Sequence, residues 1–303
     1  MKKFYYSSAG GGTICAYRWE PEGKPVAVVQ LVHGVAEHMR RYDEFAQYLA
    51  EQGVLVVGHD HMGHGASYGT EELHFVGGWE AVVEDTHRLF SQTKEEHPDL
   101  PYVLFGHSMG SFVVRTILIT YPELPISAAI ICGTGKQPAA LLTIARGMMG
   151  CICFFGGKKW HSKMVNAMMF GGYNKVFKPN RTPNDWINSD PEAVDAYTAD
   201  PLCGGTVTVG LARQMLRGLA YIQNKKNLTR MNKDLPIHFV AGKSDPVGEM
   251  GAGVLAVSKS FQAANMRLVT KQLYEGRHEI LKEPNRKEIF KDLWNFVKNS
   301  ANL

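Results

Sequence analysis

The chain has 303 residues, of which 45% are hydrophobic and 20% are charged, with a formal net charge of +4. These values are typical of a soluble globular protein with a substantial core, arranged as one large domain with an insertion or as two ordinary domains. The charge is small and forms no run of like residues, so it gives no indication of nucleic acid or another acidic partner.

Predicted strands and helices alternate along the first part of the chain. The strands are expected at 13–19, 26–32, 53–58, 102–106 and 128–132, with helices at 42–52, 79–97 and 111–121. From Lys136 to about residue 225 the alternation stops, and the segment is rich in Met, Gly and aromatic residues. It resumes with strands at 237–241 and 268–274 and helices at 252–264 and 284–299. The pattern predicts an α/β fold with a mostly parallel sheet, a core of residues 1–135 and 226–303, and a helical cap at 136–225.

The strand at 102–106 ends in the motif G-x-S-x-G, with Ser108 between Gly106 and Gly110. A helical pattern follows at once, so the motif has the strand–turn–helix context of a nucleophile elbow. The two glycines allow the arms of this sharp turn to approach each other. Ser108 is therefore the candidate nucleophile, and a tight turn with an incidental serine is the alternative.

A serine nucleophile needs a base and an orienting carboxylate, in this fold in the order Ser, acid, His. His278 follows the predicted strand at 268–274, whereas His161 falls in the cap and His238 lies inside a strand. Asp245 follows the strand at 237–241, and Asp234 precedes it at the opposite edge of the sheet. We therefore expect the triad Ser108, His278 and Asp245, with Glu249 and Glu279 as weaker candidates for the acid.

Backbone N–H groups are expected to bind the oxyanion of the tetrahedral intermediate. One comes from the residue after the nucleophile, which is Met109. The other comes from the loop after an earlier strand, where Gly34 permits the backbone twist that turns the N–H of Val35 inward. An ordinary glycine turn would leave the same pattern.

Several motifs occur in a fixed order along the chain. They are His33-Gly34-Val35-Ala36-Glu37-His38 with Arg41-Tyr42, then residues 59–67, Gly106–Gly110, Ser244-Asp245 and residues 274–279. As a set they resemble the monoacylglycerol lipase and lysophospholipase-like branch of the α/β-hydrolases. The resemblance implies an eight-stranded sheet, a helical lid over the serine, and ester hydrolysis without a cofactor. It also implies that Glu37, Arg41 and His107 lie near the alcohol part of the substrate, although Glu37 and Arg41 could simply pair with each other.

The histidines His59, His61 and His64 raise the alternative of a metal centre, because imidazoles are good zinc ligands. No acidic residue adjoins the last histidine, and no downstream His or Cys set completes a site. We therefore predict no metal here, in agreement with the resemblance, in which this stretch is a structural turn.

The cap contains Met148, Met149, Met164, Met168 and Met169, together with Phe154, Phe155 and Phe170. Methionine fills irregular gaps in a core, and it also suits an adaptable acyl-chain channel. We expect some of these side chains to pack in the core of the cap and others to line an acyl-chain channel.

The predicted function is hydrolysis of monoacylglycerol-like or other single-chain acyl esters, with a transient contact between the cap and a lipid surface left open. Alternatives on the same fold are a small-ester carboxylesterase, a lysophospholipase and a serine peptidase. A non-catalytic binding module is disfavoured because all three triad positions are filled.

The five cysteines are an odd number without a C-x-x-C motif, and the N-terminus lacks the apolar stretch of a signal peptide. We therefore expect reduced thiols in the cytoplasm. The apolar segment 139–156 is interrupted by Arg146 and two glycines, so a spanning helix is not expected.

Overall fold

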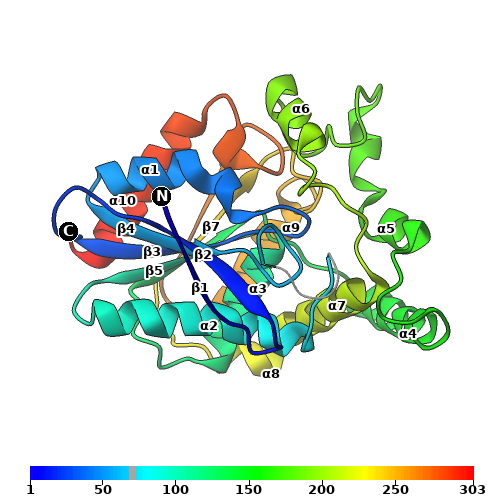
Figure 1. Ribbon diagram of the computed structural model, residues 1–303, viewed down its shortest axis with the longest axis horizontal. Coiled ribbons are helices and arrows are strands. Elements are labelled where there is room, and N and C mark those ends of the chain that lie inside the picture. The colour runs from blue at the N-terminus through cyan, green and yellow to red at the C-terminus, as the bar shows by residue number, and fades with distance from the viewer. Residues whose placement is uncertain (68–72) are drawn as a thin grey trace.

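The computed structural model describes residues 1–67 and 73–303, and its centre is an eight-stranded sheet (Figure 1). The strand order is β1-β2-β4-β3-β5-β6-β7-β8. The pairs β1–β2 and β2–β4 are antiparallel, and every other neighbouring pair is parallel. The predicted α/β architecture with a mostly parallel eight-stranded sheet is confirmed.

The elements have the following bounds. The strands are β1 (Lys2–Ser7), β2 (Thr13–Trp19), β3 (Ala27–Val32), β4 (Val54–His59), β5 (Tyr102–His107), β6 (Ala128–Cys132), β7 (Ile237–Gly242) and β8 (Val269–Tyr274). The α-helices are α1 (Asp43–Glu51), α2 (Gly78–Glu96), α3 (Met109–Thr120), α4 (Ala139–Gly156), α5 (Lys163–Phe170), α6 (Pro191–Ala199), α7 (Val209–Gln223), α8 (Lys225–Leu228), α9 (Ala252–Ala263) and α10 (Arg286–Ala301). Short 3-10 helices are η1 (Met39–Tyr42), η2 (Tyr173–Phe177) and η3 (Ile280–Lys282).

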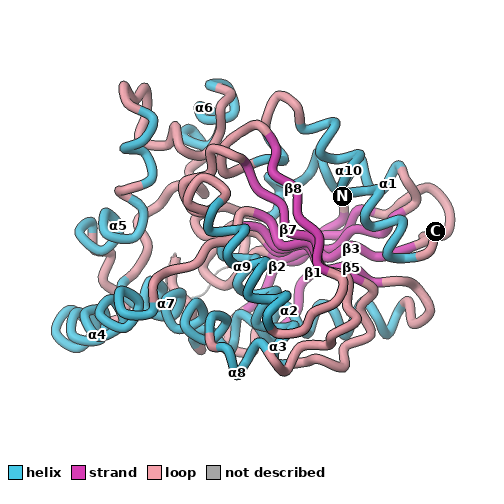
Figure 2. Tube along the Cα trace, turned by 180° about the vertical axis from the view of Figure 1, so that it is seen from behind, coloured by secondary structure: helices cyan, strands magenta, loops and turns pink. Residues whose placement is uncertain are grey.

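The central strands are buried along their whole length because helices cover both faces of the sheet (Figures 1 and 2). One face packs against α1 and α10, through side chains such as Phe45 and Phe290. The other packs against α2, α3 and α9, with Phe239 of β7 edge-on to Phe261 of α9. This two-sided burial explains the continuous apolar runs that predict these strands.

The sequence prediction misses β1. This strand lies at the edge of the sheet and pairs only with β2, and its residues alternate between exposed and partly buried positions. It therefore lacks the buried apolar run by which the other strands are recognised. Seven strands can be placed from the sequence, and the eighth was expected only from the family resemblance.

Between β6 and β7 the described chain is helical, from α4 to α8. We call residues 136–225 of this insertion the cap. Its α4 packs on α7, and α7 packs in turn on α2 and α3 of the core. The two ends of the cap meet, because Gln223 Oε1 accepts a hydrogen bond from the Gln137 N–H at 2.9 Å and Gln223 Nε2 donates to the Gln137 carbonyl at 2.8 Å.

The parallel strands bring four loops to one edge of the sheet. Gly34 follows β3, Ser108 follows β5, Asp245 follows β7 and His278 follows β8. Since β3, β5, β6, β7 and β8 are successive neighbours running in one direction, their carboxyl ends lie side by side. The fold thus gathers residues that are up to 244 positions apart in the sequence numbering, from Gly34 to His278.

Candidate active site

Ser108 occupies a strained turn between β5 and α3. Its backbone has φ 52° and ψ −120°, a conformation that a residue with a side chain rarely adopts. Cβ atoms added at the flanking glycines would lie 2.5 Å from the Gly110 carbonyl oxygen, for Gly106, and 2.0 Å from the Val32 carbonyl oxygen, for Gly110. Both positions therefore require glycine, as the motif predicts. The turn leaves Ser108 half-buried at the wall of a cavity.

His278 and Asp245 form a buried pair. His278 Nδ1 lies 2.9 Å from Asp245 Oδ1, and the two side chains are 5% and 0% exposed. The ring of His278 lies against Trp186, with centroids 5.2 Å apart, and against His107 at 4.7 Å. These contacts leave the imidazole little freedom to rotate. Ser108 and His278 line the same cavity, with Asp245 behind the histidine.

The rival residues for base and acid have other partners. His161 bonds the Thr206 carbonyl within the cap, and His238 of β7 bonds Thr270 across the sheet. Asp234 pairs with an exposed arginine, Arg267. Glu249 is an exposed residue with φ 52° in the loop before α9. None of these four residues lines the cavity that contains Ser108.

The loop after β3 lies directly against Ser108. A Cβ added at Gly34 would be 3.1 Å from Ser108 Cβ and 2.6 Å from Glu37 Oε1, so a larger residue would displace one of these side chains. Val35 and Met109 both line the cavity beside Ser108. Within residues 1–67 and 73–303, neither the Val35 nor the Met109 N–H has an assigned hydrogen-bond acceptor. Both are thus available to bind an oxyanion.

Glu37 holds this loop in place. Its Oε1 accepts hydrogen bonds from the Gly34 N–H at 2.6 Å and the Tyr42 hydroxyl at 2.9 Å, and it lies 3.2 Å from His107 Nδ1. Burial acts to raise the pKa of Glu37, but the bond with His107 and the charges of His107 and Arg41 outweigh it and hold the pKa at about 2. Glu37 is therefore an ionised carboxylate in the interior. The resemblance implied that Glu37 lies near the substrate, and the alternative, that Glu37 pairs with Arg41 beside the loop, also describes its contacts.

Arg41 lies behind Glu37 and is absent from the lining of the large cavity. Its guanidinium pairs with Glu279 at 2.5 Å and stacks on the ring of Tyr197, 4.8 Å from the centroid. It lines a separate pocket of about 20 Å³, which is the size of one water molecule. Of the three residues that the resemblance placed near the alcohol, Glu37 and His107 reach the large cavity and Arg41 does not.

The large cavity has a volume of about 890 Å³ and lies between the edge of the sheet and the cap. Its walls are mostly apolar and come from α4, α5 and α7 of the cap and from α3 of the core. The methionines expected in the cap divide between its wall and its outer surface. Met148, Met149, Met168, Met169 and Phe170 line the cavity, whereas Met164, Phe154 and Phe155 do not.

Four histidines, His33 after β3 and His59, His61 and His64 at and after the end of β4, pack beside residues 33–37, the loop after β3, which we call the oxyanion loop after its expected role. His33 Nδ1 donates to the Gly34 carbonyl at 2.6 Å, and His33 Nε2 accepts the His61 N–H at 2.9 Å. The rings of His33 and His61 lie 4.2 Å apart, and His59 and His64 pack beside His61. In the described part of the chain, these histidines do not form a group of three converging ligand atoms.

Residues 23–285 match the sequence profile of the family described as serine aminopeptidase, S33. Two relatives are a monoacylglycerol lipase of Mycolicibacterium smegmatis and a monoglyceride lipase of Mus musculus. The first is 29% identical over 96% of this chain and 95% of that protein. The second is 26% identical over 88% of this chain and 80% of that protein.

A solved structure, that of a thermostable carboxyl esterase from Bacillus coagulans in complex with glycerol, superposes with a TM-score of 0.90. It is 28% identical and covers 99% of this chain and 98% of its own. The similarity extends through the cap, where the sequence alone gave the weakest signal.

Proposed function

Because this chain belongs to the serine aminopeptidase S33 family of α/β-hydrolases, we propose that it hydrolyses single-chain acyl esters of the monoacylglycerol type through Ser108, His278 and Asp245. The proposal takes its reaction class from the family and its relatives. The choice of residues rests on the geometry at the edge of the sheet. The 890 Å³ apolar cavity that contains both Ser108 and His278 is the observation that carries it.

In the first step, Ser108 Oγ attacks the ester carbonyl carbon while His278 Nε2 takes the hydroxyl proton. Asp245 accepts the Nδ1–H of His278, which fixes the tautomer and stabilises the imidazolium. The N–H groups of Val35 and Met109 bind the carbonyl oxygen as it becomes negative. Collapse of this intermediate expels the alcohol, which takes the proton from His278.

In the second step, water attacks the acyl-enzyme with His278 as the general base. The ester bond to Ser108 breaks, the serine recovers its proton from His278, and the fatty acid leaves. No cofactor is needed for either step, because proton transfer and oxyanion binding supply the catalysis. The cap excludes bulk water from the acyl chain during both steps.

The cavity favours an ester over a peptide with a free amino terminus. An aminopeptidase site needs a carboxylate that is free to bind the substrate's ammonium group. Glu37 and Glu279 are the acidic residues in the cavity lining, and both have cationic partners in Arg41 and His107. A buried carboxylate that is already paired offers little further attraction to an ammonium group.

The direct test is turnover of a graded series of nitrophenyl esters and monoacylglycerols by wild-type protein and by Ser108→Ala. We expect a fluorophosphonate probe to label Ser108 in the wild type, and the alanine variant to lose both labelling and turnover. Undiminished turnover by Ser108→Ala would refute the mechanism. A chelator should leave the activity unchanged, since the proposed chemistry uses no metal.

Acyl-chain length separates a lipase-like from a small-ester enzyme. Each methylene that the cavity buries contributes about 0.8 kcal/mol, so two carbons should raise kcat/KM roughly tenfold until the cavity is full. The volume lies towards the upper end of the range of about 300–1,000 Å³ for ligand pockets. A maximum at acetate or propionate, measured below any micelle-forming concentration, would exclude the lipase-like assignment and leave the triad intact.

A second candidate substrate is a lysophospholipid. Lys136 and Lys163 line the same cavity, and either ammonium group could pair with a phosphate. Adding lysophospholipids to the substrate series tests this assignment directly. If Lys163→Gln lowers kcat/KM for the phosphate-bearing substrate and not for a monoacylglycerol of equal chain length, the charge is used for recognition.

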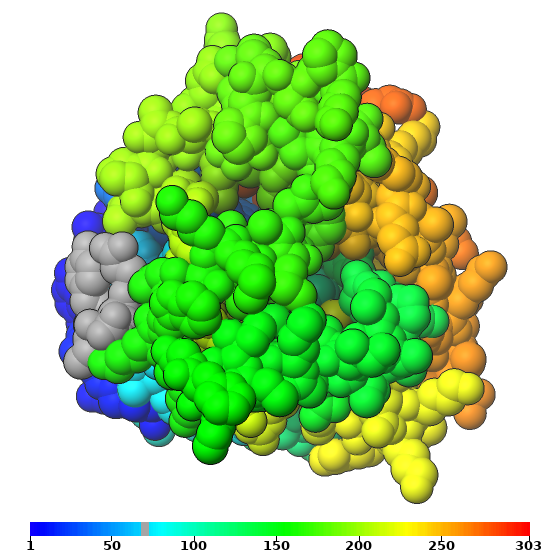
Figure 3. All heavy atoms as spheres, turned by 90° about the vertical axis from the view of Figure 1, so that its right-hand side faces the viewer, coloured from blue at the N-terminus to red at the C-terminus, as the bar shows by residue number. Residues whose placement is uncertain are grey.

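We further propose that the cap binds transiently to an anionic lipid surface. Helix α4 has a mean hydropathy of 1.7 over 18 residues, and only 17% of it is buried. Phe154 and Phe155 at its end are 83% and 86% exposed, and Met164 of α5 is 56% exposed. The cap, in green and yellow-green, covers much of the face in Figure 3. By length and composition α4 could cross a membrane, but its packing on α7 favours a helix that lies at a lipid surface.

Charge supports an anionic surface rather than a neutral one. Residues 136–184 contain eight cationic residues and no Asp or Glu: Lys136, Arg146, Lys158, Lys159, Lys163, Lys175, Lys178 and Arg181. The chain as a whole carries only +4, so the cap is markedly more basic than the core. A basic residue near an anionic membrane contributes about 1 kcal/mol to binding. The eight cations are spread among uncharged residues, so they form no run of like charges, and the long stretch without Asp or Glu is the sequence signal of this surface.

Vesicle co-sedimentation of the Ser108→Ala protein tests the lipid contact without turnover. We expect binding to vesicles of phosphatidylcholine with phosphatidylglycerol and weaker binding to phosphatidylcholine alone, with a decrease at high salt. The double variant Phe154→Ser/Phe155→Ser should bind less. Equal binding to both vesicle types would contradict the role of charge, and unchanged binding by the double variant would contradict the role of α4.

We also propose a cytoplasmic location, which the five unpaired cysteines support.

A further inference from the structure

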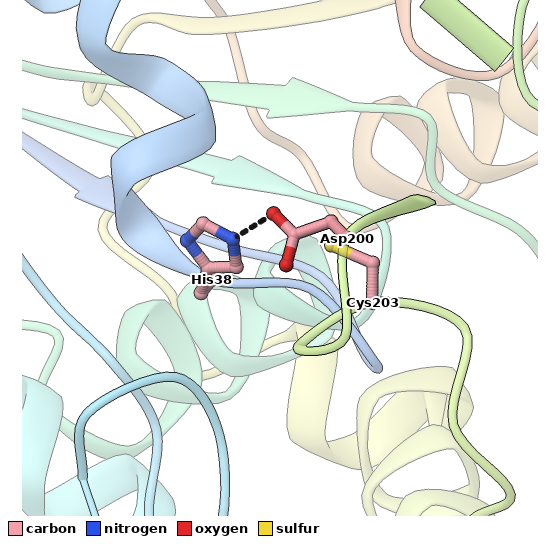
Figure 4. Close-up of side chains that lie close together, drawn as sticks. All are labelled: His38, Asp200 and Cys203. Atoms are coloured by element: carbon pink, nitrogen blue, oxygen red, sulfur yellow. Dashed lines mark hydrogen bonds and ion pairs between the residues drawn. The ribbon is translucent and has the colours of Figure 1, made fainter. Parts of the chain in front are cut away.

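A cluster of three metal-ligating side chains lies outside the cavity, where the cap meets the core (Figure 4). His38 follows the oxyanion loop and precedes η1, whereas Asp200 and Cys203 follow α6 in the cap. His38 Nε2 lies 2.8 Å from Asp200 Oδ2. One ligand atom from each residue lies within 4.8 Å of the other two. Residues from two distant segments thus converge on one point.

The donor set is an imidazole nitrogen, a carboxylate oxygen and a thiol sulfur. Zinc accepts all three ligand types in tetrahedral sites, at about 2.0–2.2 Å for nitrogen and oxygen and about 2.3 Å for sulfur. Those lengths require the donors to be roughly 3.3–3.8 Å apart. The three ligand atoms here lie within 4.8 Å of one another, with His38 Nε2 and Asp200 Oδ2 at 2.8 Å. Calcium and magnesium prefer oxygen ligands, so the histidine and cysteine favour zinc.

The surrounding charges suit a cation. Arg41 is paired with both Glu37 and Glu279, and Glu37 is also paired with His107. The charges of Arg41 and His107 are thus offset by Glu37 and Glu279, which leaves the carboxylate of Asp200 to attract a cation. A dication would therefore meet attraction rather than repulsion.

The cluster is also accessible. The Asp200 side chain is 27% exposed and Cys203 is partly exposed, whereas the His38 side chain is only 4% exposed. A cation can enter from the side of Asp200 and Cys203, and a water molecule can complete the fourth position. The His38 Nδ1 atom is buried and has no hydrogen-bond partner in the described chain, so His38 makes its one polar contact through the nitrogen that faces the cluster.

We propose that His38, Asp200 and Cys203 form a zinc-binding site that ties the cap to the oxyanion loop. The Gly204 N–H donates to the Ala36 carbonyl at 2.9 Å, and the Tyr197 hydroxyl donates to the same oxygen at 3.1 Å. The segment that carries Asp200 and Cys203 is therefore already docked on the residue after Val35. A bound ion strengthens this contact and links metal availability to the loop that holds the oxyanion. The site is independent of the substrate proposed above.

Metal binding to the reduced full-length protein tests the site directly. Cobalt(II) is the probe, because a thiolate ligand gives it a charge-transfer absorption, and zinc should displace it. Isothermal titration with zinc should give one site per chain. Zinc should also raise the Tm, because it binds the folded state in preference to the unfolded state. None of these measurements depends on ester hydrolysis.

Two variants each remove one ligand, and a third variant, at another cysteine, serves as a matched control. Cys203→Ser should lose the charge-transfer absorption, and both Cys203→Ser and Asp200→Asn should bind zinc at least about tenfold more weakly. Cys151→Ser removes an exposed cysteine of α4 and should bind as the wild type does. Asp200 is partly exposed, so its variant remains informative if Cys203→Ser folds poorly. Wild-type zinc affinity in Asp200→Asn, or wild-type cobalt absorption in Cys203→Ser, overturns the proposal.

Discussion

Glu37 shows how one buried carboxylate can serve catalysis without touching the reacting atoms. Its Oε1 receives the Gly34 N–H and the Tyr42 hydroxyl and lies beside His107. The backbone that carries Val35, one of the two proposed oxyanion donors, is thereby fixed to the core. His107 is fixed in the same way, and burial acts to lower its pKa while the bond and charge of Glu37 act more strongly to raise it. Glu37 is a positioning residue in this arrangement.

Glu37→Gln should lower kcat and leave KM nearly unchanged. The amide oxygen can still accept one hydrogen bond, but the charge that attracts His107 and Arg41 is lost, and the loop shifts. A displacement of about 1 Å at a catalytic group can cost roughly 100-fold in rate. Steady-state kinetics on a soluble ester measures kcat and KM separately. The control is Glu44→Gln, which removes an exposed partner of Arg286. A wild-type kcat in Glu37→Gln would show that the loop holds its shape without the carboxylate.

Asp245 and Asp234 provide a comparison between two aspartates near the same strand. Asp245→Asn should cost about four orders of magnitude in kcat, because His278 loses the partner that orients and stabilises its cation. Asp234 is an exposed partner of Arg267, so its asparagine variant should change stability by less than about 0.5 kcal/mol and leave kcat unchanged. Equal effects in the two variants would place the acid elsewhere.

Helix α3 connects Ser108 to both ends of the cap. Its Arg115 is 2% exposed, and the guanidinium donates to Thr134 Oγ1 at 3.1 Å, to the Gly135 carbonyl at 3.3 Å and to the Ile222 carbonyl at 3.4 Å. Gly135 precedes the cap and Ile222 lies in the last turn of α7. Arg115 has no ion pair in the described chain, and burial lowers its pKa to about 9. Burying a charge without a carboxylate partner costs free energy. The hydrogen bonds of Arg115 offset part of this cost and join the two ends of the cap to α3.

Arg115→Met should reduce hydrolysis of long-chain esters more than that of acetate esters. The variant leaves two buried carbonyls without a donor, which costs about 1–3 kcal/mol of stability and loosens the ends of the cap. Only a long acyl chain needs the cap wall, so the ratio of kcat/KM for decanoate to acetate should fall. Arg217→Met on the exposed side of α7 is the control. A uniform loss for both esters would indicate damage to the nucleophile helix and not to the cap.

The sequence predicts well those elements whose burial is evident from a short, continuous stretch of residues. Strand β5 reads as an apolar run and was expected at 102–106, and α1 was expected at 42–52 and spans Asp43–Glu51. Edge strand β1 has no such run. The contact between His38 and Asp200 joins residues 162 positions apart, so no local pattern could indicate it. The triad positions could be proposed only because strand order determines which loops share an edge.

At the scale of the whole molecule, the buried histidines link stability to pH. His33, His59, His61 and His64 are all buried, and burial lowers the pKa of each, to about 3 for His59 and about 4 for His64. The charge of Glu37 acts in the opposite direction on His61 and His64, without outweighing burial. In the unfolded chain these imidazoles titrate near 6.5. Below that pH the unfolded state binds more protons than the folded state, so acid favours unfolding.

The four histidines should therefore make the free energy of unfolding fall as the pH drops from about 6.5 towards 4, whereas His107, whose pKa is raised, contributes with the opposite sign. Each histidine contributes up to about 1.4 kcal/mol per pH unit in this window. Glu37 makes the free energy of unfolding depend on pH only below its unfolded pKa of 4.5, because its folded pKa is about 2. Urea unfolding at a series of pH values measures the slope. His64→Gln should flatten it, and His161→Gln, at an exposed position, should not. A pH-independent free energy from 7 to 5 would contradict the assignment of neutral histidines.

The pairing of Gln137 with Gln223 makes the cap an exchangeable cassette. The chain leaves the core and returns to it at nearly the same place, so the strand order does not depend on what lies between. The entropy of closing a loop grows only slowly with its length, by about 0.6 kcal/mol per doubling. Cassettes of very different size can therefore occupy this junction at similar cost. In such a scaffold, substrate range can diverge through recombination at two neighbouring glutamines while the reaction itself is inherited unchanged.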